Sequence, residues 1–293
     1  MLIPSLGRVT ACLSSQVGCP LNCSFCATAR LATRRNLSVG EIFDQVVLLQ
    51  NASQEAFGTH LSNLVFMGMG EPLLNYDSVT ASISHKTAEK GLGISPRRIT
   101  LSTAGLTKGI TRLAHEKVKF NLAISLHTAD DAKRDSLMPV NKSNPLSELA
   151  ESLKFFFQET GTRISYEYLL MKDFNDSLRD ASEFAEFCKI TPCKINLIEY
   201  NEVEGSAFFK TTPERYLASS EAKNLTALAT SEGKPISFNG INSSICANIS
   251  IGTLSVIADL IKTGATALTV IFLLPTSLAR LLVNPITPAL VDA

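Results

Sequence analysis

Three cysteines lie close together near the start of this 293-residue sequence, in the segment Cys19-Pro-Leu-Asn-Cys23-Ser-Phe-Cys26. Thiolates are soft ligands that suit iron–sulfur clusters and zinc. Three thiolates can bind only three of the four irons of a cubane cluster, so the fourth iron stays open to bind and activate another molecule. The spacing therefore predicts a [4Fe-4S] cluster with one reactive iron, held by Cys19, Cys23 and Cys26.

Two other thiol sites compete with this interpretation. A structural zinc ion takes four nitrogen or sulfur ligands in a closed tetrahedron, usually from two separated pairs. No C-x2-C or H-x3-H pair follows the loop in the sequence, so Cys12 would have to be the fourth ligand. A redox pair of Cys23 and Cys26 has thioredoxin-like spacing but leaves Cys19 without a role. The cluster is therefore favoured over both alternatives.

The composition indicates a globular chain without an electrostatic bias. Apolar residues make up 45% of the sequence, and 27 basic side chains balance 27 acidic ones. A net charge of zero gives no global argument for binding nucleic acid or membranes, so any such contact must be local. The first residues, MLIPSLGRVTACLSSQ, lack the charged and apolar regions of a signal peptide, which predicts a cytoplasmic location. In that reducing compartment Cys188, Cys193 and Cys246 are expected to be small buried side chains.

Six apolar, β-branched runs alternate with segments of helical period. The runs predicted as strands are 8–14, 63–68, 98–103, 120–126, 164–170 and 194–200. The segments predicted as helices, with apolar residues at i, i+3 and i+4, are 41–51, 78–89, 106–116, 145–160 and 177–189. Apolar strands joined by helices form parallel sheets with both faces covered. The predicted fold class is α/β, a partial (β/α)6 barrel with parallel strands in preference to a doubly wound sheet.

Polar residues gather where four of these strands end. The segments are MGMGEP (67–72), STAG (102–105), SLH (125–127) and EYN (199–201). Parallel α/β folds bind their ligands at the carboxyl ends of the strands. The four segments and the cysteine loop are therefore expected to form one site.

The character of the sequence changes after about residue 233. Residues 234–293 are rich in Leu, Ile, Thr and Ala and show no clear period. The apolar run 267–274 is interrupted by Pro275, Ser277 and Arg280 before it reaches the roughly 18 residues that a membrane span needs, so no membrane partner is expected. We predict a core domain in residues 1–233 and, in residues 234–293, a divergent apolar segment that is either frameshifted or poorly ordered.

The sequence resembles the RlmN/Cfr family of radical-SAM RNA methyltransferases. The resemblance runs from about residue 2 to about residue 233. It rests on several long sequence segments that occur in the same order as in the family. These segments are SSQVGCPLNCSFCATA (14–29), NLVFMGMGEPLLNY (63–76), RITLSTAGL (98–106), FNLAISLHTADDAKRDSLMPVN (120–141) and YEYLLMKDFND (166–176).

The resemblance implies a binding site for S-adenosyl-L-methionine at the strand ends. Gly70 and Glu71 would bind its amino group, through close backbone approach and a charge-assisted hydrogen bond. Further contacts with the same cofactor are implied for Ser102, Ser125, Leu126, His127 and Asn201. Taken singly, the Gly-Glu-Pro segment would be a strand-ending turn and His127 a histidine of the core.

The resemblance also implies a reaction, the methylation of C2 of adenine in 23S ribosomal RNA and, in RlmN-type members, in certain tRNAs. A [4Fe-4S] cluster and a 5′-deoxyadenosyl radical carry this chemistry, so large-subunit ribosomal RNA, tRNA and an electron donor are the implied partners. The adenine must leave its stack to enter such a pocket. Candidate contacts with RNA phosphates are Arg8, Arg30, Arg34, Arg35, Arg97 and Arg98.

Two departures from the family pattern leave other functions open. The family begins with an accessory domain and ends with a glycine-rich motif whose cysteine carries the methyl group, whereas this chain starts later and reads KPISFNGINSSICANISIG at 234–252. Cys246 lies near the expected place among residues that do not match, and Cys12 matches a family cysteine upstream of the cluster. The catalytic residue is therefore unknown, with Cys246 as a candidate, and we expect a truncated member altered after residue 233. The alternatives are a radical-SAM enzyme with another substrate and an inactive metal- or RNA-binding fragment.

Overall fold

The structure is a computed structural model that describes residues 1–5, 7–32, 34–87, 93–203, 205–213 and 215. The predictions for residues 234–293, including Cys246 and the apolar run 267–274, lie outside these ranges. Within the described ranges, no helix is long and apolar enough to cross a membrane.

Seven strands form the main sheet, in the order in which they follow one another along the chain: β1 (Leu2–Ser5), β2 (Arg8–Cys12), β5 (Asn63–Phe66), β6 (Ile99–Thr103), β7 (Asn121–Ser125), β8 (Ile164–Leu170) and β9 (Cys193–Glu199). The six strands from β2 to β9 pair in parallel. This confirms the six predicted strands and the partial parallel barrel. The sequence did not reveal β1, which pairs antiparallel with β2 at the edge of the sheet.

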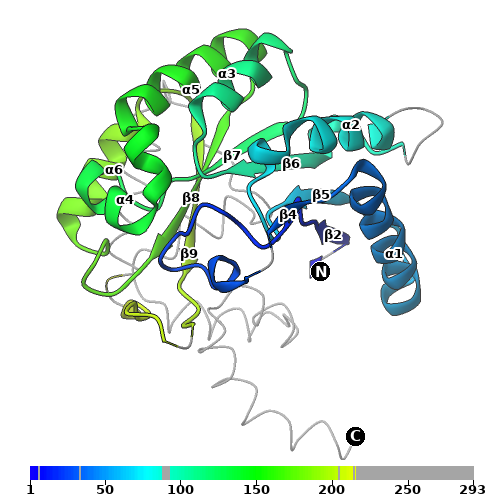
Figure 1. The fold of residues 1–293 in the computed structure, drawn as a ribbon, viewed down its shortest axis with the longest axis horizontal. Helices are drawn as coiled ribbons and strands as arrows, with labels where there is room; N and C mark the ends of the chain where they lie inside the picture. Colours follow the sequence, from blue (N-terminus) through cyan, green and yellow to red (C-terminus); the bar gives the residue numbers. More distant parts are fainter. Residues whose placement is uncertain (6, 33, 88–92, 204, 214, 216–293) are drawn as a thin grey trace, which may run out of the picture. The chain divides into compact units, whose positions relative to one another are not determined.

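Six α-helices join these strands: α1 (Val39–Phe57), α2 (Tyr76–Thr87), α3 (Thr107–His115), α4 (Asp131–Leu137), α5 (Leu146–Thr160) and α6 (Leu178–Cys188). Four short 3-10 helices also occur: η1 (Ala27–Arg30), η2 (Pro72–Asn75), η3 (Pro96–Arg98) and η4 (Pro139–Ser143). Five of the helices match the predicted segments, and α4 is an addition. Figure 1 shows α1, α2, α3, α5 and α6 along the outer side of the curved sheet.

The main core lies between the sheet and these outer helices. Alternate strand residues such as Val9, Ile99 and Leu122 pack against it and lose all or nearly all of their exposure. Because successive residues of a strand point to opposite faces, Ser102 and Ser125 lie on the inner face. The expectation that helices cover both faces therefore holds for the outer face only, and the inner face carries polar side chains. Cys188 and Cys193 are buried in the core, as predicted.

Side-chain hydrogen bonds set where the helices begin. Ser38 and Glu41 form a capping box at the start of α1, and Ser177 and Asp180 form another at the start of α6. Such boxes satisfy backbone N–H groups that have no partner within the helix.

A second, smaller apolar cluster lies at the carboxyl ends of the strands. Its buried residues are Ala104, Leu137, Met138, Val140, Met171 and Tyr200. Cys23 and Phe25 of the cysteine loop pack against it. The loop is thereby attached to the end of the sheet where the sequence predicts a site.

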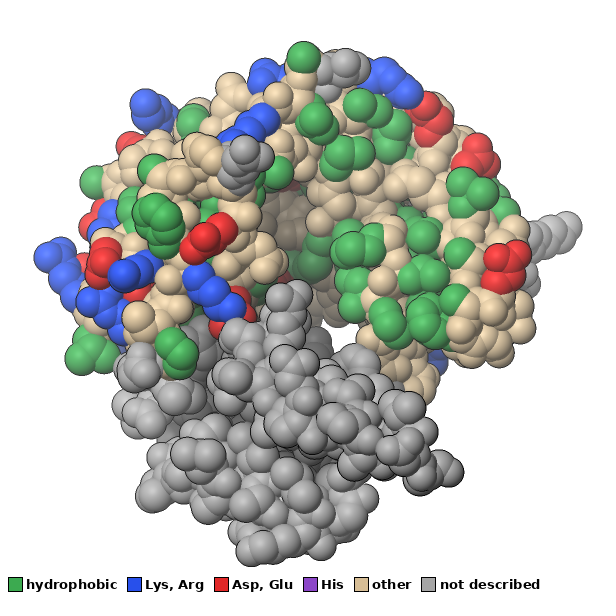
Figure 2. All heavy atoms as spheres, turned by 90° about the horizontal axis from the view of Figure 1, so that it is seen from below, with side chains coloured by type: hydrophobic (Ala, Val, Ile, Leu, Met, Phe, Trp, Pro, Cys, Tyr) green, Lys and Arg blue, Asp and Glu red, His purple; other side chains and the backbone are tan. Residues whose placement is uncertain are grey.

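Exposed apolar side chains are concentrated near the start of the described chain. Figure 2 shows hydrophobic side chains gathered on the right of the view and most Lys and Arg side chains on the left, around a hollow, with Asp and Glu on both sides. Exposed apolar residues of β1, α1 and the segment after β5 are Met1, Ile3, Val47, Leu48, Phe57, Met67 and Met69.

Candidate active site at the carboxyl ends of the strands

The cysteine loop starts and ends at a small hairpin. Strand β3 (Gln16–Val17) pairs antiparallel with β4 (Arg35–Asn36), so the chain leaves and returns at neighbouring points. Within the loop the backbone N–H of Cys26 donates to the carbonyl of Cys23 over 3.1 Å, and Cys26 is the N-cap of η1. The thiols of Cys19, Cys23 and Cys26 are free and partly buried. The loop therefore presents three unpaired sulfur ligands from one short segment.

Burial and mutual repulsion keep two of these thiols protonated in the metal-free chain. Burial raises the pKa of Cys19, and it raises the pKa of Cys23 to about 12. Negative charges on Cys26, Cys19 and Glu71 contribute to this raised pKa of Cys23, whereas the Arg134 cation opposes it. A bound metal reverses this balance, because it stabilises the thiolate and releases the proton.

Within the residues that the structure describes, no three His, Cys, Asp or Glu side chains are grouped as ligands of a metal ion. The ligands of a cubane bind different irons, so the three thiols need not converge on one point. Cys12, which the zinc interpretation requires, lies at the end of β2, and its thiol contacts the backbone of Met67. Three free thiols on one loop suit a cluster as a donor set.

Gly70 and Glu71 lie in the turn that follows β5 and contact Gln16, at the start of the cysteine loop. Gly70 has a φ of 95°, and a Cβ at this position would lie 2.5 Å from the Cβ of Gln16. The Gln16 side chain accepts from the Glu71 N–H over 2.9 Å and donates to Asn36 over 2.7 Å. Glycine is therefore required here by the contact with Gln16 as well as by the backbone angle.

The Glu71 carboxyl is 3% exposed, and both of its oxygens accept backbone hydrogen bonds. Oε1 accepts from the N–H of Leu73 over 3.0 Å, and Oε2 accepts from the N–H of Ala104 over 2.7 Å. Burial raises the pKa of Glu71 to about 7, although these N–H groups act to lower it. The Thr103 side chain also bonds to this carboxyl, so Glu71 joins the ends of β5 and β6.

The next two predicted residues meet on neighbouring strands. The hydroxyls of Ser102 on β6 and Ser125 on β7 lie 3.4 Å apart. Leu126 follows directly and is fully buried. The structure therefore brings STAG and SLH together, as the strand order requires.

His127 adopts a left-handed backbone conformation with a φ of 60°, which is unusual for a residue with a side chain. Its Nδ1 accepts from the backbone N–H of Leu169 over 3.1 Å, and its carbonyl accepts from the Asn175 side chain over 2.6 Å. Burial and, to a smaller extent, the Arg134 charge lower the pKa of His127 to about 3. The ring is neutral and also contacts the Phe25 ring of the cysteine loop.

The remaining predicted contacts are less closely grouped. Asn201 is exposed just beyond the end of β9. Arg34 donates to Asn22 within the cysteine loop, and Arg35 pairs with Glu41 over 2.7 Å. The other candidate phosphate contacts lie in two places. Arg30 is in η1 beside the loop, and Arg8, Arg97 and Arg98 are at the amino ends of strands. The latter three lie at the opposite edge of the sheet from the cysteine loop.

Several polar residues that hold this site received no role from the sequence. Asn75 donates to the carbonyls of Ser15 and Leu37 at 2.8 and 2.7 Å, and so fixes both ends of the loop. The other members of this group are Gln16, Arg134 and Asn175, which bond to backbone atoms of different elements. Two of them could be recognised in the sequence as polar residues in a segment that follows a strand: Asn75 in GEPLLNY and Asn175 in KDFND.

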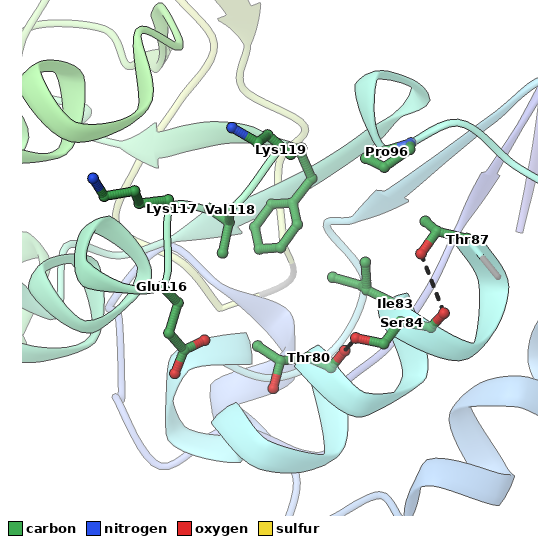
Figure 3. Close-up of a pocket in the computed structure, with 10 residues that line it drawn as sticks. Thr80, Ile83, Ser84, Thr87, Pro96, Glu116, Lys117, Val118 and Lys119 are labelled. Carbon is green, nitrogen blue, oxygen red and sulfur yellow. Dashed lines mark hydrogen bonds between the residues drawn. The ribbon is translucent and has the colours of Figure 1, made fainter.

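A cavity of about 310 Å³ lies at the other end of the sheet (Figure 3). Thr80, Ser84 and Thr87 of α2 line one side, and Lys117 and Lys119 line the other. The three hydroxyls donate to carbonyls of their own helix. This cavity contains none of the predicted site residues.

Comparison with known families and proteins matches the region that contains the site. Residues 13–185 match the model of the radical SAM superfamily. The chain is 52% identical over 215 residues to the "Probable dual-specificity RNA methyltransferase RlmN" of Cytophaga hutchinsonii, covering 73% of this chain and 59% of that protein. It is 48% identical over 240 residues to the protein of the same name from Flavobacterium psychrophilum, covering 80% and 69%. The chain thus spans about 60 to 70% of the length of these two relatives.

Solved structures share the fold. A radical SAM methyltransferase from Sphaerobacter thermophilus is 39% identical, with a TM-score of 0.74 over 77% of this chain and 66% of that chain. Streptococcus suis SuiB bound to S-adenosylmethionine is 20% identical, with a TM-score of 0.54 over 76% of this chain and 49% of that one. The second likeness concerns the fold alone.

Proposed function

Because the chain belongs to the radical SAM superfamily and, within it, to the RlmN family, we propose that it is the core of a radical-SAM RNA methyltransferase. Membership of the superfamily implies two cofactors, a [4Fe-4S] cluster and S-adenosyl-L-methionine. Cys19, Cys23 and Cys26 hold the cluster in this proposal. When bound, the cluster supplies the electron that cleaves S-adenosyl-L-methionine to a 5′-deoxyadenosyl radical.

The residues at the strand ends orient the second cofactor. Glu71 offers the amino group a carboxyl group whose two oxygens are each held in place by one backbone N–H. The paired hydroxyls of Ser102 and Ser125 offer hydrogen bonds from the inner face of the sheet, and neutral His127 bounds the site beside the loop. We assign Gly70, Leu126 and Asn201 to the same contact surface.

One observation supports this proposal above the others: the cysteine loop is attached to the strand ends that carry the predicted cofactor residues. The N–H of Ser24 donates to the carbonyl of Leu137 over 2.9 Å, and Phe25 contacts His127. A cluster on this loop would lie beside the strand ends where the cofactor binds. That proximity is what a reaction between the two requires.

The substrate in this proposal is C2 of an adenine in large-subunit ribosomal RNA, and in tRNA. In this proposal Arg30, which is exposed beside the cysteine loop, contacts an RNA phosphate. Arg34 and Arg35 contribute less, because they already bond to Asn22 and Glu41. The reaction takes its electron from a cytoplasmic donor, in a compartment where the thiols stay reduced.

Anaerobic reconstitution with ferrous iron and sulfide tests the cluster. Wild-type chain is expected to take up iron and sulfide and to release 5′-deoxyadenosine when it is reduced with S-adenosyl-L-methionine present. Cys23→Ala removes one ligand and should abolish both. Cys12→Ala is the matched control and should keep the cluster, since a loss of metal in Cys12→Ala would support the zinc site instead.

Labelled methyl donor then tests the RNA reaction. Incorporation into 2-methyladenosine of ribosomal RNA or tRNA is the expected result. Release of 5′-deoxyadenosine without any RNA methylation would contradict the methyltransferase assignment and favour a radical-SAM enzyme with another substrate. Failure of wild-type chain to bind a cluster would overturn the proposal as a whole.

A further inference from the structure

Arg134 of α4 is a fully buried charged side chain at the carboxyl ends of the strands. Its guanidinium donates to the carbonyls of Ala104 over 2.7 Å, Ser125 over 3.3 Å and Leu126 over 3.2 Å. It also donates to the side-chain oxygen of Asn141 over 2.7 Å. All four acceptors are neutral, so the hydrogen bonds of the guanidinium are satisfied without a direct ion pair.

A buried cation without an anion is costly, because the protein interior solvates a charge less well than water does. Among the described residues, no carboxylate forms an ion pair with Arg134. Asp131 and Asp135 act on Arg134 through space, and each accepts a hydrogen bond over 2.8 Å from the amide of Asn141 and none from the guanidinium. The arrangement therefore leaves positive charge available to a further anion at this end of the sheet.

The cysteine loop lies on the same helix. The backbone N–H of Ser24 donates to the carbonyl of Leu137, which lies one turn after Arg134. Cys23 packs against the smaller group of apolar side chains that contains Ala104 and Leu137. Gly105 leaves room for the guanidinium, since a Cβ there would lie 3.3 Å from Nη2. Burial lowers the pKa of Arg134 to about 10, and a negative charge on Cys23 opposes this more than Asp131 or Asp135 does.

We propose that Arg134 is a positioning residue that compensates the negative charge of the cluster and favours its reduced state. This inference rests on the proposed function, in which Cys23 is a ligand. Three thiolates give a [4Fe-4S] cluster a net negative charge, and reduction by an external one-electron donor adds one more. Net charge and hydrogen bonding near a cluster set its reduction potential. A fixed buried cation therefore stabilises the reduced form more than the oxidised one.

A redox titration of the reconstituted protein, followed by the electron paramagnetic resonance signal of the reduced cluster, measures this effect. Arg134→Gln is expected to lower the equilibrium constant for reduction about tenfold, a shift of about 59 mV to more negative potential for one electron. Asp135→Asn removes a nearby negative charge and keeps the oxygen that Asn141 bonds. It should shift the potential in the opposite direction.

Two further variants separate charge from packing. Arg134→Lys keeps the cation and should stay closer to the wild-type potential than Arg134→Gln does. Arg112→Gln removes an exposed charge on α3 and should not change the potential. If Arg134→Gln fails to fold, Asp135→Asn and Arg134→Lys still decide the question.

The result that overturns the inference is a reduction potential that is unchanged or more positive in Arg134→Gln, or that shifts equally in Arg134→Gln and Arg134→Lys. If Arg134→Gln does not fold, an unchanged potential in Asp135→Asn overturns it instead. That outcome leaves the proposed function intact. A wild-type chain that binds no cluster fails at the earlier step and contradicts the proposed function itself.

Discussion

The ring of Phe25 meets the imidazole of His127 edge to face, with ring centroids 4.9 Å apart and planes inclined at 81°. Phe25 is the residue before the last cysteine of the loop, and His127 ends the SLH segment after β7. The pair therefore joins the loop that would hold the cluster to the strand ends that would hold the second cofactor.

Phe25→Leu should loosen the cysteine loop without unfolding the chain. Leucine keeps an apolar contact with the side chains around Leu137. The edge-to-face contact with His127, typically worth about 0.5 to 1.5 kcal/mol, is lost. Backbone amides in residues 19–26 should then exchange with solvent about 3- to 10-fold faster, measured by hydrogen–deuterium exchange. Phe57→Leu, at an exposed position in α1, serves as the control. Unchanged exchange in Phe25→Leu would show that the ring contact does not hold the loop.

His127 should be neutral, with its proton on Nε2, throughout the physiological pH range. Nδ1 accepts a hydrogen bond from Leu169 and so carries no proton, and burial lowers the pKa of His127 to about 3. As the pH falls below 6.5 the unfolded chain takes up a proton that the folded chain does not, so the free energy of unfolding decreases. Nitrogen-15 shifts of the imidazole check the tautomer. A ring that titrates near pH 6.5 in the folded protein would refute this assignment.

Glu71 should make the metal-free protein less stable as the pH rises from about 4.5 to about 7. The pKa of Glu71 is raised from 4.5 to about 7, so in this window the folded state retains a proton that the unfolded state has lost. The loss in free energy of unfolding is at most about 3 kcal/mol and levels off above pH 7. Urea unfolding of wild type and Glu71→Gln at several pH values gives the comparison. A pH-independent difference between them would contradict the prediction.

Gly70→Ala should lower the free energy of unfolding by about 2 to 4 kcal/mol, because it adds backbone strain at a φ of 95° and a clash with Gln16. Gly40→Ala in α1 is the matched control, since the nearest atom to its new Cβ is Ser38 Oγ at 3.9 Å. That variant should be neutral or more stable by up to about 1 kcal/mol. Urea unfolding measures both, and equal effects would mean that the Gln16 contact yields at little cost.

The strands and most helices could be predicted because their buried faces are apolar and periodic. Helix α4 could not, since its seven residues bury only Arg134 and Leu137, and hydrophobic periodicity counts an arginine as polar. Strand β1 escaped for a related reason: it is short, contains Pro4 and lies largely exposed at the edge of the sheet.

The location of the site could also be predicted, because parallel strands bring MGMGEP, STAG and SLH to one edge. The side-chain hydrogen bonds that hold the site together could not be predicted. Glu71 reaches the backbone of Ala104, and Asn75 reaches the backbone of Ser15 and Leu37, across separations of 33 to 60 residues. Local patterns do not encode such long-range contacts.

The order of the strands in the sheet has a consequence for the chain as it is synthesised. Each new strand joins the edge left by the one before, so the sheet can grow from its amino-terminal side. Cys26 emerges about 100 residues before His127 and Arg134. At typical rates of about 5 to 20 residues per second, that interval lasts roughly 5 to 20 s. During this time the cysteine loop lacks its contacts with His127 and Leu137, so its three thiols are open to oxidation and to metal binding in the nascent chain.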